Sequence, residues 1–167
     1  MSNKLEMPPV FVDAKIVNPF LNCTMNVFRD MLYFLPDYGK PYIGNPISNH
    51  RWEVTGIAEL EGESSGIVAL RLTNFLAEKL LAQTGLTIEV EEERPEILDG
   101  LICELVNMIS SQASTELGQY SISITPPYTV LGENHLIAWP QRIPIIGVPF
   151  NTKYGPFVVE LCLLSKK

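Results

Sequence analysis

Apolar residues recur at near-helical spacing close to the start of the chain. Between about Ala14 and Tyr33 they are Ile16, Phe20, Met25, Phe28, Met31 and Leu32. This spacing predicts a long helix, with Pro19 in its first turn or at a break near it. The segment that follows, residues 35–50, gathers proline and glycine in "LPDYGKPYIGNPISNH" and is typical of a loop or an edge strand.

A second pattern begins at Arg51, where apolar and polar residues alternate on both sides of "EGESSG". Alternation of this kind predicts a half-buried antiparallel hairpin over residues 51–72. Thr73 or Asn74 is placed to cap a short helix that Gly85 ends, with Leu76, Leu80 and Leu81 on its apolar side. The next residues, "LTIEVEEE" at 86–93, have the pattern of a strand that ends in an acidic run.

Residues 94–118 predict a second long helix. Pro95 and Glu96 suit its first turn, because a missing N–H is harmless there and a carboxylate meets the positive end of the helix dipole. Gly118 is the expected end. One broad arc of this helix is apolar and is expected to face the core, and it consists of Ile97, Leu98, Leu101, Ile102, Leu105, Met108 and Ile109.

The remaining apolar segments are strand-like and are divided by glycine and proline. They are "YSISITPPYTVLG", "RIPIIGVPFNT" and "GPFVVELCLL". With the hairpin they predict an α+β fold, in which two long helices and a shorter one pack on a largely antiparallel sheet. A chain of 167 residues with 46% hydrophobic residues is expected to form a single domain over 1–167, with residues 1–12 as an extended N-terminal segment.

Charge and cysteine content narrow the function classes. The 12 basic and 19 acidic side chains give a net charge of −7, which argues against binding to nucleic acid or to anionic membranes. Cys23, Cys103 and Cys162 are widely spaced among apolar residues, so we expect reduced, buried thiols rather than disulfides or zinc ligands. Neither a signal peptide nor a membrane span is recognisable, so a cytoplasmic protein is expected.

Polar residues form a narrow stripe on the second long helix, away from its apolar arc. Gly100, Glu104, Asn107 and Ser111 fall within about 60° of one another on a helical wheel. Such a stripe is either the solvated edge of an amphipathic helix or a site. The spacing alone favours the solvated edge, but the small residues around Glu104 and Asn107 leave the backbone open to close approach, so that a flat partner surface could dock there.

Other candidate residues are weaker. His50 and His135 stand apart from any second ligand, so both are expected on loops or the surface, and no metal site is assigned. "LNCTMNVF" in the first helix echoes "LICELVNM" in the second, and aligning Cys23 with Cys103 puts Thr24 and Val27 where Glu104 and Asn107 stand. A related pair of halves and a chance match both explain so short an echo.

Across most of its length the chain resembles CheX proteins of the CheC/CheX/FliY family, which are phosphatases of the chemotaxis response regulator CheY. The resemblance lies in the order and spacing of "VNPFLNCTMNVFRDM", "WEVTGIAELEGESSGIVALRL", "CELVNMI" and "IPIIGVPFNTKYGPFVVEL". In the family, the acid and the amide of a Glu-x-x-Asn motif do the work, and they match Glu104 and Asn107 here.

The resemblance implies a function and partners. Asn107 is expected to orient the water that attacks an aspartyl phosphate of a CheY-like regulator, and Glu104 to contact a lysine of that regulator. Gly100 and Ser111 are expected to lie at the partner contact. No cofactor of its own is implied, because the regulator brings Mg²⁺. The family also implies a homodimer formed through sheet edges, and the apolar "FVVELCLL" at 157–164 is compatible with such an edge.

This sequence departs from the family pattern at three places. The family usually has Asp or Ser where Gly100 stands, and Asp99 lies about 140° from Glu104 on the helix, so it cannot substitute simply. Ser111 replaces a usual glycine, and the proline that follows the helix in the family comes early here, as Pro126 or Pro127. The alternative to a phosphatase is therefore a non-catalytic module of the same fold that binds a response regulator or a flagellar-switch component.

Overall fold

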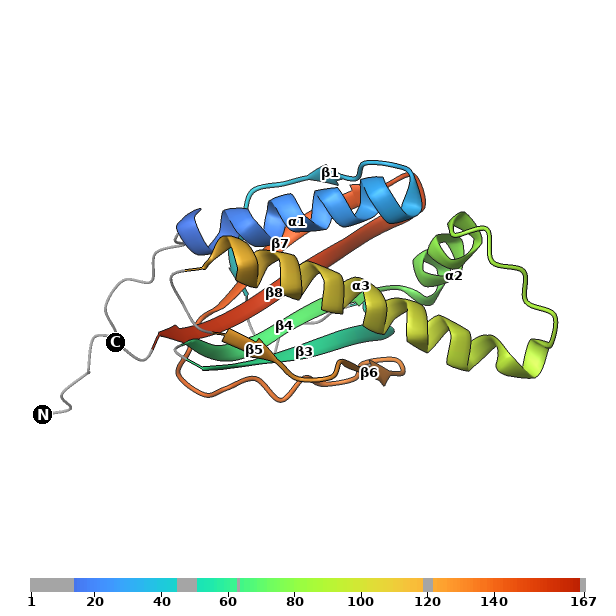
Figure 1. Ribbon diagram of the computed structural model, residues 1–167. Coiled ribbons are helices and arrows are strands. Elements are labelled where there is room, and N and C mark those ends of the chain that lie inside the picture. The colour runs from blue at the N-terminus through green and yellow to red at the C-terminus, as the bar shows by residue number, and fades with distance from the viewer. Residues whose placement is uncertain (1–13, 45–50, 63, 119–121, 166–167) are drawn as a thin grey trace, which may run out of the picture.

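The computed structural model describes residues 14–44, 51–62, 64–118 and 122–165. Helices α1 and α3 lie side by side across one face of an eight-stranded sheet, and α2 sits at one end of it (Figure 1). The elements are α1 (Ala14–Leu32), β1 (Asp37–Tyr38), β2 (Tyr42–Gly44), β3 (Val54–Gly62), β4 (Ser64–Leu72), α2 (Asn74–Gln83), a 3₁₀ turn (Glu91–Glu93), α3 (Arg94–Glu116), β5 (Ile122–Ile124), β6 (Tyr128–Leu131), β7 (Ile145–Thr152) and β8 (Gly155–Ser165). The predicted fold class is confirmed. The expected N-terminal segment 1–12 lies outside the described residues.

Every strand pair in the described sheet is antiparallel. The order is β1-β7-β8-β4-β3-β5, with β2 also pairing with β7 and β6 also pairing with β3. Strand β8 therefore lies inside the sheet, paired with β4 on one side and β7 on the other. The expectation that residues 157–164 form an open edge is wrong, because the two edges of the sheet are the short strands β1 and β2 and the short strands β5 and β6.

Helix α1 packs on the sheet through aromatic rings. Phe28 stacks on Phe157 of β8 with ring centroids 4.7 Å apart, and Phe157 stacks in turn on Phe150 of β7 at 4.8 Å. Pro19 lies in the second turn rather than the first, and the helix continues through it. Its neighbour Phe20 is fully buried, so packing on the sheet compensates for the backbone hydrogen bond that proline lacks.

Local sequence signals place α2 and its flanks. Thr73 is the N-cap of α2, and its hydroxyl accepts a hydrogen bond from the Leu76 N–H at 3.1 Å. Gly85 follows the helix with a φ of +77°, a conformation that suits glycine. Residues 86–90 form a loop instead of the expected strand, because this segment is largely exposed and pairs with no strand of the described sheet.

The face of the sheet opposite the helices carries a buried polar cluster. The Arg71 Nη1 atom of β4 lies 3.0 Å from a carboxylate oxygen of Glu160 on β8, and its Nε donates to the Thr55 hydroxyl at 3.2 Å. The Thr55 hydroxyl lies 2.6 Å from Nε2 of His135, whose Nδ1 lies 2.8 Å from the Gly132 carbonyl oxygen. His135 lies in the loop after β6, which is one of the two expected positions, but it is buried and not at the surface, and it ties this loop to the sheet. His50 lies outside the described residues.

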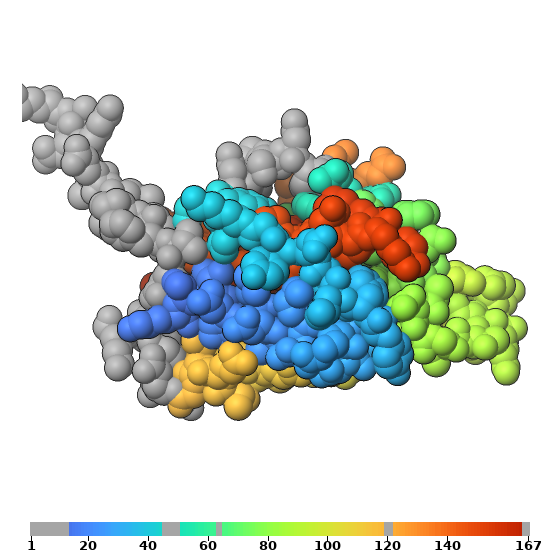
Figure 2. Space-filling view, turned by 90° about the horizontal axis from the view of Figure 1, so that it is seen from above, coloured from blue at the N-terminus to red at the C-terminus, as the bar shows by residue number. Residues whose placement is uncertain are grey.

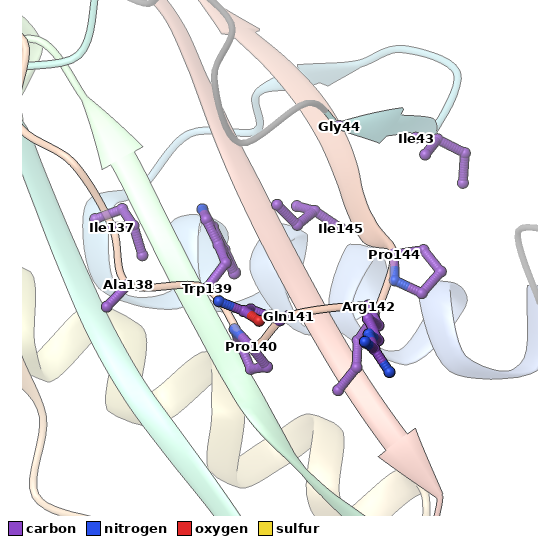
Figure 3. Close-up of a pocket in the computed structure, with 11 residues that line it drawn as sticks. Ile43, Gly44, Ile137, Ala138, Trp139, Pro140, Gln141, Arg142, Pro144 and Ile145 are labelled. Carbon is purple, nitrogen blue, oxygen red and sulfur yellow. The ribbon is translucent and has the colours of Figure 1, made fainter.

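The rest of the segment between β6 and β7 crosses the same face. Residues 137–145, with Ile43 and Gly44 of β2, line a hollow of about 520 Å³ (Figure 3). The sticks of Trp139, Pro140 and Arg142 stand in front of the strands, while the helices lie behind them. In the described ranges, no helix is long and apolar enough to cross a membrane.

Candidate functional site

Helix α3 is held close to the sheet by a glycine beneath it. A Cβ added to Gly56 of β3 would lie 2.7 Å from Cγ2 of Ile102 and 3.4 Å from Cγ1 of Val106. Any side chain at position 56 would therefore push the helix outward. On the side of α3 that faces the sheet, Leu101, Ile102, Leu105 and Ile109 of the predicted arc are buried and Val106 is buried with them, whereas Ile97, Leu98 and Met108 are only half-buried. The opposite side of α3 is left toward solvent.

The four stripe residues share this outward side of α3. Gly100, Glu104 and Ser111 are exposed and Asn107 is half-buried. Three residues along a helix correspond to about 4.5 Å of rise and about 60° of rotation, so Glu104 and Asn107 present their side chains together. Neither side chain has a hydrogen-bond or ion-pair partner within the described part of the chain. Both are free to bind an external group.

In α1, the positions that echo the pair are not equivalent to it. Thr24 and Val27 are buried, and the Thr24 hydroxyl donates to the Phe20 carbonyl of its own helix at 2.7 Å. Alignment through the two cysteines thus puts buried positions of α1 over outward positions of α3. Of the two matched pairs, only the one on α3 faces solvent (Figure 2 shows α1 beside the gold part of α3).

Asp99, unlike Glu104 and Asn107, forms a hydrogen bond within the fold. Its carboxylate accepts a hydrogen bond from the Thr129 hydroxyl of β6. This contact fixes the first half of α3 against the edge strand and keeps the Asp99 carboxylate away from the face that carries Glu104. The prediction that Asp99 does not replace the missing polar side chain at position 100 agrees with this placement.

The surroundings of the pair are acidic and contain a protonated thiol. Residues 95–116 include Glu96, Asp99, Glu104 and Glu116 but no lysine or arginine. Arg94, at the start of α3, is paired with Glu91 and Glu78, each at 2.9 Å. Cys103 is half-buried rather than buried as expected, and desolvation together with the charge of Asp99 raises the pKa of its thiol.

The arrangement suits contact with a positively charged surface better than binding of a metal. No group of three or more His, Cys, Asp and Glu side chains is placed to hold a metal ion in the described ranges. Glu104 is a single carboxylate on an open helix face, and the hollow of Figure 3 lies across the sheet from it. A neutral amide next to a carboxylate can hold a water and accept a cationic side chain at the same time.

Comparison with known families identifies the family of this chain. The model of the family described as "Chemotaxis phosphatase CheX" matches residues 54–151, which include β3, β4, α2 and the whole of α3. The chain belongs to the CheX family. The matched range contains Gly100, Glu104, Asn107 and Ser111. Comparison with curated protein sequences gave no significant match.

Solved CheX structures share the fold over nearly the whole chain. A chemotaxis protein CheX from Desulfovibrio desulfuricans is 27% identical, with a TM-score of 0.81 over 90% of this chain and 99% of the other. CheX from Vibrio vulnificus is 25% identical, with a TM-score of 0.78 over 90% and 100%. A chain in a CheX–CheY–BeF₃–Mg²⁺ complex from Borrelia burgdorferi has the same fold, with 24% identity and a TM-score of 0.74 over 89% and 97%.

The structure also shows a site feature that the sequence did not indicate. Gly56 lies 48 residues before Glu104, and nothing in the alternation of β3 identifies it as the residue against which α3 packs. The observation that a strand glycine often marks close approach of another backbone is the one signal that could have identified it.

Proposed function

We propose that this protein hydrolyses the aspartyl phosphate of a CheY-like response regulator, with Asn107 positioning the attacking water and Glu104 docking a lysine of the regulator. The observation that supports this most is that an exposed acid and a half-buried amide lie side by side on the outward face of α3, neither with a partner in the described chain. Membership of the CheX family supports the reaction class. The CheX–CheY complex from Borrelia burgdorferi shows that a protein of this fold binds such a regulator.

Hydrolysis of an aspartyl phosphate needs few catalytic groups from the phosphatase. The water oxygen forms a bond to phosphorus, the bond from phosphorus to the aspartate oxygen breaks, and the products are inorganic phosphate and the free carboxylate. An acyl phosphate is already activated, so placing water in line with the leaving carboxylate is the main contribution. The Asn107 amide can accept a hydrogen bond from that water and donate one to a phosphoryl oxygen while remaining neutral.

Glu104 would contribute to the affinity for the regulator and would fix the position in which the regulator docks. A carboxylate and a lysine ammonium form a charge-assisted hydrogen bond, and the absence of basic residues from 95–116 leaves the carboxylate free to form it with a partner. Gly100 and Ser111 lie one turn before Glu104 and one turn after Asn107, so they would border the contact. We assign Mg²⁺ to the regulator, where it would neutralise charge on the phosphoryl group.

Turnover distinguishes this proposal from a non-catalytic binding module. The protein is mixed with a twentyfold excess of a phosphorylated CheY-like regulator from the same source, and loss of the phosphoryl group is followed over time. A phosphatase removes many phosphoryl groups per molecule, whereas a binder changes the decay of at most the regulator molecules that it holds. Decay that is unchanged beyond that stoichiometric fraction would exclude catalysis.

The homodimer implied by the family also remains a proposal. Because β8 is interior, a dimer through sheet edges would have to use β1 and β2 or β5 and β6. Light scattering in solution would give the mass directly, and a monomer at micromolar concentration would contradict a stable dimer.

A further inference from the structure

Two lysines gather on one part of the surface without a counter-charge. Lys79 of α2 and Lys153 of the turn between β7 and β8 form no ion pair within the described part of the chain, where each of the four ion pairs involves an arginine. Over the whole chain, acidic side chains outnumber basic ones by 19 to 12. Although the chain is acidic, the charges of these two lysines are therefore left available to a partner.

Aromatic rings bring the two lysines together. The Lys79 Nζ atom lies 5.3 Å from the ring centroid of Phe75, one turn before it on α2, and 5.7 Å from that of Tyr154. The Lys153 Nζ atom lies 5.0 Å from the centroid of the same Tyr154 ring. Figure 2 shows the β7–β8 turn, in red-orange, next to α2, in green. Aromatic rings attract cations without neutralising them, so these four residues form one cationic surface, the lysine–aromatic patch.

The fold holds this patch in place. The Thr152 hydroxyl donates to the Gly155 carbonyl oxygen at 2.9 Å and accepts from the Tyr154 N–H at 3.0 Å, which fixes the turn between β7 and β8. Tyr154 packs against the core and Lys79 is half-buried, whereas Phe75 is 60% exposed. Two ammonium groups therefore converge beside an exposed ring. Because like charges repel, an anion that meets both would stabilise the patch.

The patch lies next to the start of α3. Glu78, the neighbour of Lys79 in α2, forms an ion pair at 2.9 Å with Arg94, the first residue of α3. From Arg94, Glu104 lies about 15 Å further along the helix and Asn107 about 20 Å. A protein–protein contact of ordinary size covers about 800 Å² on each side and is about 30 Å across. One partner can therefore reach both the patch and the acid–amide pair.

We propose that the lysine–aromatic patch binds an acidic segment of the same response regulator that docks on α3. Complementary charge supports this partner, because Glu104 presents an anion to a lysine of the regulator while the patch presents two cations to its carboxylates. Two contacts of opposite sign fix the orientation of the regulator and so direct its phosphorylated aspartate toward Asn107. The acidic segment lies about 20 Å from that aspartate, which is the length of α3 between Arg94 and Asn107. The inference rests on the proposed function and adds the orientation of the partner to it.

The test replaces Lys79 or Lys153 by glutamate and uses Arg142→Glu as a matched control. Each change turns one positive charge into a negative one, but Arg142 is exposed on the face of the sheet opposite the helices (Figure 3). Lys79→Arg is a second control that keeps the cation. Titration with the regulator carrying beryllofluoride on its aspartate gives Kd at low and at high salt, dephosphorylation gives KM and kcat, and thermal unfolding gives Tm.

The expected pattern is a salt-dependent loss of docking. Lys79→Glu and Lys153→Glu should each raise Kd and KM by about tenfold at low salt, because attraction becomes repulsion. The effect should shrink to about twofold in about 0.5 M salt, where the charges are screened. The kcat at saturating regulator should stay within about twofold of wild type, because neither lysine contacts the reacting groups. Lys79→Arg and Arg142→Glu should leave Kd and KM unchanged.

Each other result overturns a defined statement. If wild type dephosphorylates the regulator and neither glutamate variant changes Kd or KM, the inference is wrong while the proposed function stands. If Arg142→Glu weakens binding as much as the patch variants do, net charge alone explains the loss and the inference is again wrong. Should a glutamate variant have a lowered Tm, Lys79→Gln and Lys153→Gln take its place, and an unchanged Kd for both overturns the inference. If wild type neither binds nor dephosphorylates any regulator tested, both the proposed function and the inference fail.

Discussion

Glu104 offers a direct way to separate docking from folding. Its carboxylate is exposed and has no partner in the described chain, so Glu104→Gln should change the free energy of unfolding by no more than about 0.5 kcal/mol. In the complex, the same change would replace a charge-assisted hydrogen bond to a regulator lysine with a neutral one. Hydrogen bonds to charged groups contribute about 1.5–3 kcal/mol and neutral ones about 0.5–1.5 kcal/mol, so the exchange should cost about 1–1.5 kcal/mol, which corresponds to about a 5- to 13-fold increase in KM.

The assay is the initial rate of dephosphorylation at increasing concentrations of phosphorylated regulator, at low and at moderate salt. Wild type should lose affinity with salt more steeply than Glu104→Gln, because salt screens the charge that the variant lacks. Glu61→Gln is the matched control, since Glu61 is exposed and follows the core residue Leu60 on β3, so that its side chain points away from α3. A KM within twofold of wild type at low salt would refute the docking role of Glu104.

Three further outcomes are expected. Glu160→Gln should lower the free energy of unfolding by about 3–5 kcal/mol, because it leaves the Arg71 guanidinium buried without its counter-charge; chemical denaturation measures this, and a loss below about 1 kcal/mol would contradict the buried pair. Thr73→Ala should lower the free energy of unfolding by about 1 kcal/mol, because α2 loses its N-cap. Thr73→Ser keeps a capping hydroxyl and should unfold with a free energy close to that of wild type in the same measurement. Cys103 should react with iodoacetamide more slowly than free cysteine at pH 8, and its reaction should become faster as the pH rises past 9, because its pKa is raised. Mass spectrometry measures the extent of reaction, and a rate as fast as that of free cysteine would contradict the raised pKa. Bound regulator should also protect the Cys103 thiol from the reagent.

Local signals in the sequence were sufficient for the elements that depend on neighbouring residues. The hairpin β3–β4 follows from alternation around a glycine turn, and α2 follows from a capping threonine before it and a glycine after it. The stripe on α3 was visible because helical spacing alone brings Glu104 and Asn107 together. What these residues do could be proposed only through the resemblance, since an acid and an amide three residues apart are common on solvated helices.

Features that depend on distant parts of the chain were not predictable in this way. The order of strands places β8 inside the sheet, although its apolar sequence is equally compatible with an edge. His135 lies in a polar segment that reads as a loop, yet Thr55, 80 residues away, meets it inside the molecule. Residues 86–90 have the composition of a strand but find no strand to pair with, which only the assembled sheet reveals.

The central claim is that the Asn107 amide positions the attacking water, and it is tested most directly by the decay rate of a phosphorylated CheY-like regulator with Asn107→Ala. The substitution removes a half-buried amide that has no partner in the described chain and introduces a good helix former, so the variant should fold normally and keep its Kd for the beryllofluoride-loaded regulator within a few-fold. Loss of one positioned catalytic hydrogen bond typically costs about 10²–10³-fold in kcat. We predict decay close to that of the regulator alone, and a variant that binds the regulator and still accelerates decay as wild type does would contradict the account.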